Sequence, residues 1–106
     1  MTYPYPIHIP FDEIKSICEK WSIIELAFFG SVLRDDFSDT SDIDILVRFD
    51  EPVKLTFSDW DTMERELSDS FGRKVDLVDR KTVETSANYL RKHAILNDAQ
   101  VIYAVR

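Results

Sequence analysis

The sequence has 106 residues, of which 44% are hydrophobic and 31% are charged, and its formal net charge is −7. This length and composition predict a single soluble globular domain over residues 1–106, because such a chain can bury one core but not two. No apolar run reaches the roughly 18 residues that a membrane span needs. The N-terminus also lacks the basic and apolar segments of a signal peptide.

The charge distribution and the cysteine content exclude further classes of protein. Residues 1–72 carry 6 basic and 16 acidic side chains, whereas residues 73–106 carry 7 basic and 4 acidic ones. An acidic body argues against direct nucleic-acid binding, which needs a positive surface. The basic C-terminal part suits a solvated helix face or, alternatively, contact with a phosphate or an acidic partner. Cys18 is the only cysteine, so we expect a buried core residue, no disulfide and a cytoplasmic location.

The first predicted elements are a helix and a strand. After an extended lead-in that ends at Pro10, apolar residues recur at the spacing of one helix face: Phe11, Ile14, Cys18 and Trp21. The run from Ile23 to Phe29 is rich in β-branched and aromatic residues and ends at Gly30. This pattern predicts a largely buried strand.

The remaining elements complete a mixed fold. A second strand is predicted at Ile43 to Phe49 and a third at Lys74 to Val78. Between them, a helix that ends at Gly72 is marked by the apolar face of Phe57, Trp60, Met63 or Glu64, Leu67 and Phe71. One further helix is expected over Thr82 to Asn97 around Tyr89, Leu90 and Ile95, followed by a terminal strand or tail at Val101 to Val105. The order predicts an α/β (α+β) domain with a small mixed β-sheet and helices packed on at least one face.

Three aspartates in the predicted strands are candidate metal ligands. Side chains alternate across a strand, so Asp42 and Asp44 share a face with Leu46. A solvated strand face is the ordinary explanation, but the apolar residue two positions on weakens it. Asp76 stands in an apolar strand, where an unpaired charge is costly. If the second and third strands are neighbours, the three carboxylates converge and suit Mg²⁺, which completes its shell with water and substrate phosphates.

The residues after the first strand add a candidate phosphate site. Gly30 permits close backbone approach to a ligand, and Ser31 offers a hydroxyl and an amide nitrogen. If a helical turn begins here, its amides face the anion as well. Arg34 follows three residues later and can bind a phosphate as a planar fork. A Gly-Ser pair by itself predicts only a turn, and the aspartates that follow are what favour phosphate binding.

At these positions the sequence resembles a known family. Gly30-Ser31, ten residues, and then Asp42-Ile43-Asp44 is similar to the signature of the DNA polymerase β-like nucleotidyltransferases. The stretches FGSVLRDDF and SDIDILV, with GRKVDLVD behind them, resemble the minimal nucleotidyltransferases of prokaryotes. The resemblance covers roughly residues 10–104 and implies a polymerase β-like nucleotidyltransferase fold.

The resemblance also implies an activity and a partner. Such minimal nucleotidyltransferases act as antitoxins of helical HEPN-domain toxins encoded beside them, and transfer AMP from ATP onto a toxin tyrosine. Under this hypothesis, Asp42 and Asp44 hold two Mg²⁺ ions that bridge the triphosphate, and Asp76 completes the metal that receives the attacking hydroxyl. Gly30 and Ser31 grip the β- and γ-phosphates. Arg34 neutralises charge on the triphosphate or on the pyrophosphate.

Two other functions stay open from the sequence. The chain could neutralise a toxin by binding alone, although three intact aspartates favour catalysis. It could instead nucleotidylate a small molecule such as an antibiotic, although the sequence has no acceptor domain unless a homodimer builds the pocket. The sequence fixes neither the base preference, nor the number of nucleotides added, nor a homo- or hetero-oligomeric state.

The other polar residues near the motif receive structural interpretations. Asp35, Asp36 and Asp39 are expected to solvate the loop, with local turn contacts from Ser38, Asp39 and Ser41. Asp79 is a weaker candidate than Asp76, because it faces away from Asp76 if the strand continues. His8 and His93 are expected to be surface or partner-contact residues.

Overall fold

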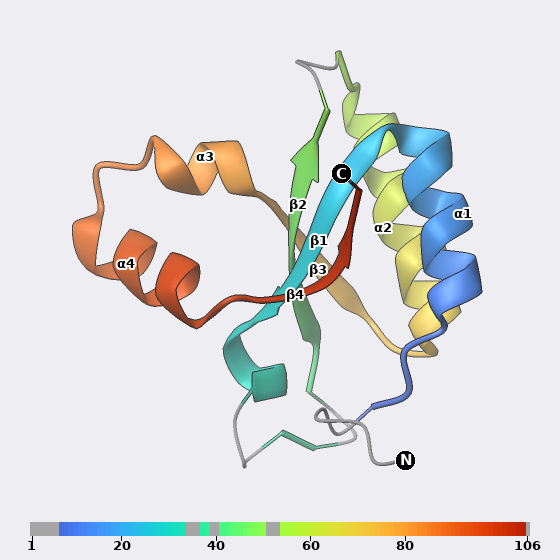
Figure 1. Cartoon of the computed structure of the whole chain (residues 1–106), viewed down its shortest axis with the longest axis horizontal. Coiled ribbons are helices and arrows are strands. Elements are labelled where there is room, and N and C mark those ends of the chain that lie inside the picture. The colour runs from blue at the N-terminus through green and yellow to red at the C-terminus, as the bar shows by residue number, and fades with distance from the viewer. Residues whose placement is uncertain (1–6, 34–36, 39–40, 51–53, 106) are drawn as a thin grey trace.

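A four-stranded mixed sheet in the order β3-β2-β1-β4 lies at the centre of the molecule (Figure 1). The strands are β1 (Ile23–Phe29), β2 (Ile43–Phe49), β3 (Val75–Asp79) and β4 (Gln100–Ala104). β1 runs antiparallel to β2 and β4, whereas β2 and β3 run parallel. The computed structural model describes residues 7–33, 37–38, 41–50 and 54–105, without the side chain of Ser31. The predicted mixed sheet and the predicted bounds of its first two strands are confirmed, and the terminal segment is a strand.

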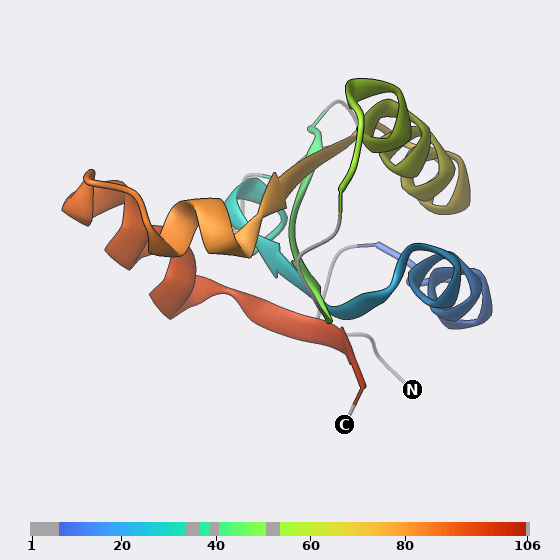
Figure 2. The ribbon, with the colours of Figure 1, turned by 90° about the horizontal axis from the view of Figure 1, so that it is seen from above.

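Two long helices pack side by side on one face of the sheet (Figure 2). α1 (Phe11–Trp21) and α2 (Phe57–Phe71) both lie where the apolar spacing predicts them. α2 begins with a capping box, in which Thr56 and Asp59 each accept the other's backbone N–H at 3.0 Å. It ends at Gly72, whose φ of 71° is left-handed.

The structure corrects one residue of the predicted apolar face of α2 and decides between two others. Phe57 is 94% exposed and takes no part in the packed face. Of the two candidates Met63 and Glu64, Met63 is the core residue. The Glu64 carboxylate instead accepts the backbone N–H of Leu77 at 2.9 Å, which satisfies a donor of β3.

The single helix predicted over Thr82 to Asn97 is wrong. Two helices are present, α3 (Arg80–Glu84) and α4 (Tyr89–Asp98). The side chain of Asn88 accepts the backbone N–H of Arg91 at 3.1 Å and so starts α4 afresh. Short polar side chains of this kind compete with a continuous helix for backbone hydrogen bonds, which explains the break.

Helices cover both faces of the sheet, in agreement with the prediction of at least one covered face. The larger core lies between the sheet and α1 and α2, and includes Leu26, Phe28, Ile45, Val47, Met63 and Leu67. Cys18 is fully buried there, and burial, with Glu19 nearby, raises the pKa of its thiol to about 12. The smaller core on the opposite face joins α3 and α4 to the sheet through Ala27, Phe29, Leu46, Val83 and Ile95. Within the described part of the chain, no helix is long and apolar enough to cross a membrane.

Candidate active site

The site is built around two aspartates on neighbouring strands. Asp44 of β2 and Asp76 of β3 are register partners in the parallel pair. Parallel neighbours lie about 4.8 Å apart, and register partners point to the same face. Leu46, two residues after Asp44, packs in the smaller core, so this is the face that α3 and α4 cover. The condition set from the sequence, that the second and third strands are neighbours, is met, and it places Asp44 beside Asp76.

Asp42 stands two residues before Asp44, just ahead of β2. It is exposed, and its Oδ2 atom lies 3.9 Å from Nζ of Lys74. The side chains are 46% and 72% exposed, so this long ion pair is worth less than about 1 kcal/mol. Such a contact yields readily to a stronger ligand of the carboxylate, such as a divalent cation.

Gly30 lies directly against the Asp44 carboxylate. Phe29 is the register partner of Asp44, and Gly30 follows it with a left-handed φ of 72°. A Cβ atom at Gly30 would collide with Oδ2 of Asp44 and come within 3.3 Å of its Cγ. The glycine is therefore needed for two reasons, its backbone conformation and the space that the carboxylate occupies.

The expected helical turn after the first strand is present as η1 (Gly30–Leu33), a single 3₁₀ turn. Its start lies beside the first residues of β2 at the lower end of the sheet in Figure 1. The backbone of Ser31 is thus next to the aspartates. The side chain of Ser31 lies outside the described residues, as do Arg34, Asp35, Asp36 and Asp39.

Arg73 holds the loop that leads into Asp42, a role that the sequence did not reveal. Its Nη1 atom donates to the carbonyl oxygens of Ser38 at 3.0 Å and Ser41 at 3.3 Å. Its guanidinium also lies 4.7 Å from the ring centroid of Phe37. Ser38 and Ser41 make the predicted turn, in which the N–H of Ser41 donates to Ser38 O at 3.0 Å. Because the hydrogen bonds of Arg73 to Ser38 and Ser41 join segments more than thirty residues apart, no local pattern predicts them.

The remaining candidates have structural contacts. The carboxylate of Asp79 accepts the backbone N–H of Lys81 at 3.0 Å and caps α3, which explains its presence without a role beside Asp76. Arg80 donates to the carboxylate of Glu25 at 2.8 Å, on the sheet face that bears Asp44 and Asp76. This contact anchors the start of α3 to β1. His93 is exposed and pairs with Asn97 at 2.8 Å, and His8 is exposed as well.

The carboxylates suit Mg²⁺ by their chemistry. Oxygen ligands from one to three carboxylates, completed by water and phosphate, are what this cation prefers. Among the described residues, no group of three or more Asp, Glu, His or Cys side chains is already arranged around a metal position. Asp44 and Asp76 lie side by side, and Asp42 stands two residues before Asp44. This arrangement fits a cation that already carries water and phosphate ligands.

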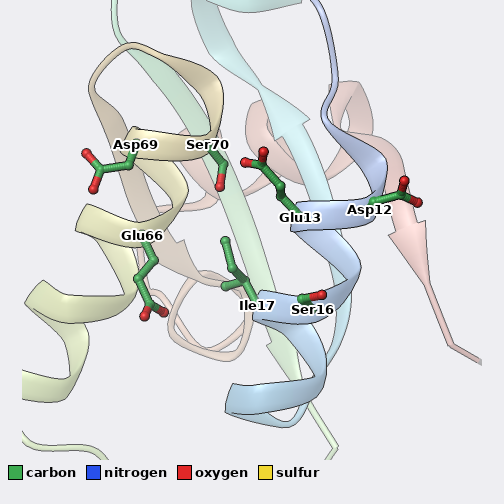
Figure 3. A pocket seen from close by; sticks show the side chains of 7 residues that line it. All are labelled: Asp12, Glu13, Ser16, Ile17, Glu66, Asp69 and Ser70. Atoms are coloured by element: carbon green, nitrogen blue, oxygen red, sulfur yellow. The ribbon is translucent and has the colours of Figure 1, made fainter.

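A separate groove of about 490 Å³ lies between α1 and α2 (Figure 3). Its rim is acidic, with Asp12 and Glu13 from α1 and Glu66 and Asp69 from α2. These helices cover the sheet face opposite to the one that bears Asp44 and Asp76. The groove is therefore not part of the aspartate site.

Comparison with known proteins identifies the family. Residues 13–102 match the family described as Nucleotidyltransferase domain. The chain is 37% identical over 78 residues to "Putative protein adenylyltransferase MJ1217" of Methanocaldococcus jannaschii, which covers 74% of this chain and 76% of the relative. It is 35% identical over 72 residues to "Protein adenylyltransferase MntA" of Thermococcus cleftensis, which covers 67% of this chain and 70% of the relative.

A solved structure gives the same fold. It is a crystal structure of a toxin-antitoxin with AMP-PNP, which aligns with a TM-score of 0.65 over 90% of this chain and 73% of that chain. The identity is 18%, so this likeness concerns the fold alone. The chain therefore belongs to the nucleotidyltransferase domain family, as the Gly-Ser and Asp-x-Asp motif predicts.

Proposed function

We propose that this chain transfers AMP from ATP to a hydroxyl of a partner protein in a magnesium-dependent reaction, and that it thereby acts as an antitoxin. The observation that carries the proposal is the register pairing of Asp44 with Asp76. Gly30, which begins a turn, lies against the Asp44 carboxylate. Two relatives bear the name protein adenylyltransferase, and a protein of the same fold is a toxin-antitoxin crystallised with AMP-PNP. A HEPN-domain toxin is the partner that the sequence resemblance implies.

The residues would divide the work of one in-line displacement. Asp42, Asp44 and Asp76 would hold the metal, and Mg²⁺ bound there would polarise the phosphates and stabilise the entering and leaving oxygens. Asp76 would take the proton from the acceptor hydroxyl. The acceptor oxygen then forms a bond to the α-phosphorus, the bond from that phosphorus to the β-phosphate bridging oxygen breaks, and pyrophosphate leaves.

The other motif residues would position the nucleotide. Backbone amides at Gly30 and Ser31 would donate to the β- and γ-phosphates, as amides at the start of a turn do. Arg34 would neutralise charge on the triphosphate or the pyrophosphate. Holding the reactants in line supplies much of the rate. Arg73 would contribute indirectly, because it holds the turn that leads into Asp42.

The test is a transfer assay with the adjacent HEPN protein. The chain is incubated with Mg²⁺, α-labelled ATP and that protein, beside an Asp42→Ala/Asp44→Ala variant. Label on the partner that the double variant does not produce supports the proposal. A stable complex without label, together with full neutralisation of the toxin by the double variant, would show that the antitoxin acts by binding alone.

Small-molecule nucleotidylation is distinguished in the same assay. An aminoglycoside or lincosamide is added for this purpose, and label on that compound, with none on the protein, would assign the acceptor to that class.

If the label is on the toxin, mass spectrometry maps the labelled residue. Mutation of that residue then identifies the acceptor hydroxyl.

A further inference from the structure

Two exposed apolar residues, Tyr89 and Leu90, stand at the start of α4, beyond the part of the helix that packs on the sheet. Ile95 is 8% exposed and lies in the smaller core, with Leu96 packed against it. Tyr89 stands seven residues before Leu96 and therefore lies on the same side of the helix. Yet Tyr89 is 79% exposed, and its neighbour Leu90 is 87% exposed. Leu90 lies about 8 Å along the helix axis from Ile95, where nothing in the described part of the chain covers it.

This end of α4 flanks the side from which a large acceptor must approach the aspartates. α3 and α4 project from the sheet face that bears Asp44 and Asp76 (Figure 2). The opposite face is closed by α1 and α2. A protein that brings a hydroxyl to the two carboxylates therefore has α3 and α4 beside it. Adjacent exposed apolar residues in such a place indicate an interaction site rather than scattered surface residues.

The charge of the same segment points to the chemistry of the partner. Residues 80–98 carry four basic and two acidic side chains in a chain whose net charge is −7. Arg80 is engaged with Glu25 and Glu84. Within the described residues, no ion pair joins Lys81, Arg91 or Lys92 to a carboxylate. Exposed Tyr and Arg are also the residue types that most often anchor protein interfaces.

We infer that the outer end of α4 (Tyr89, Leu90 and Arg91) docks the protein that supplies the acceptor hydroxyl. This surface, called here the α4 tip, fits a partner that presents an apolar spot surrounded by acidic side chains. The inference rests on the proposed function and adds the surface by which the acceptor is recognised. Docking at the α4 tip would hold the partner on the open side of the aspartates.

A pair of matched variants tests the apolar part of the surface. Tyr89→Ser/Leu90→Ser removes the two exposed side chains, and Phe57→Ser removes one of comparable exposure from α2. Both are made in an Asp44→Asn background without ATP, so that binding of the adjacent HEPN protein is measured without transfer. Tyr89→Ser/Leu90→Ser should raise the Kd for the partner by about tenfold or more, whereas Phe57→Ser should leave the Kd unchanged. Circular dichroism and thermal midpoints should match the parent, because none of the three side chains is buried.

The charge variant and the transfer assay separate the inference from the proposed function. Arg91→Glu should weaken binding at low salt and flatten its salt dependence. In the active chain, the α4 tip variants should raise the KM for the protein acceptor and leave the KM for ATP unchanged. If the α4 tip variants bind the partner as the parent does and transfer is intact, the inference alone is overturned. It is also overturned if these variants dissociate a homodimer of this chain and leave partner binding unchanged. Partner binding that depends on the α4 tip, without any transfer by the active chain, would overturn the proposed function alone.

Discussion

The two faces of the sheet differ in what their side chains accomplish. Among the described residues, the larger core between one sheet face and α1 and α2 has fourteen fully or nearly buried members. The opposite face holds a core of five, and its free end carries Asp44 and Asp76 side by side. Like charges in register destabilise a sheet, so this pair adds no stability to the sheet by itself. Stability is thus concentrated on one face and, under the proposed function, chemistry on the other, and the strands connect them.

The largest effect is expected from Asp44→Asn. This variant keeps the shape of the side chain and removes the charge that would hold the cation, so AMP transfer should fall roughly a thousandfold. Its thermal midpoint should equal or exceed that of the parent, because the repulsion from Asp76 is relieved. Asp69→Asn, on the outer side of α2, is the control and should retain full activity. Transfer within tenfold of the parent would exclude Asp44 as a metal ligand.

The second prediction concerns the opposite face. Leu67 is fully buried between α2 and the sheet, so Leu67→Ala should lower the free energy of unfolding by about 2–5 kcal/mol. Urea denaturation measures this loss. Transfer per folded molecule, measured well below the midpoint, should stay within about twofold. A proportionate loss of activity in the folded state would show that the larger core also positions the aspartates.

The third prediction uses two glycines with nearly the same backbone. Gly30 and Gly72 have φ values of 72° and 71°, but a Cβ at Gly72 meets nothing within 4 Å, whereas one at Gly30 meets the Asp44 carboxylate. Gly72→Ala should therefore cost only the left-handed strain of about 1–2 kcal/mol, with normal transfer. Gly30→Ala should cost at least as much in stability and reduce transfer by about tenfold or more. Equal activity of the two variants would mean that the Asp44 position is not critical.

Sequence patterns predicted the features that local spacing determines. The continuous apolar runs located β1 and β2 to the residue, and strand alternation assigned Asp44 and Asp76 to their face. The pairing of β2 with β3 stayed conditional, because strand order depends on contacts between distant segments. The break between α3 and α4 was missed, since Asn88 can continue a helix or cap a new one.

The positioning contacts of the site were beyond local reasoning for the same cause. Arg73 holds Ser38 and Ser41 across more than thirty residues, and Glu64 accepts the N–H of Leu77 from another element. Asp79 was recognised as a weaker candidate than Asp76, but its role as the cap of α3 appears only once that helix is placed. The motif thus predicts which residues carry the chemistry, whereas the surrounding contacts explain how they are held.

The smallest effect belongs to the surface of the helical face and depends on pH. Glu66 accepts hydrogen bonds from Lys20 at 2.5 Å and from the Trp21 indole at 2.7 Å, which hold the pKa of its carboxyl below the ordinary value of 4.5. A folded-state pKa below the unfolded-state pKa stabilises the protein at every pH above the unfolded-state pKa. This contribution is lost as the pH falls through the folded-state pKa.

Glu66→Gln should therefore be less stable than the parent at pH 7, by less than about 1 kcal/mol. The difference in stability should vanish in the acid range below pH 4.5. Asp69→Asn, which removes a carboxylate from the same groove without a comparable pair of donors, is the control and should match the stability of the parent at pH 7. Since α1 and α2 are joined here and not at the aspartates, transfer activity should not change; a constant stability difference across the pH range would show that the Glu66 charge has no part in joining them.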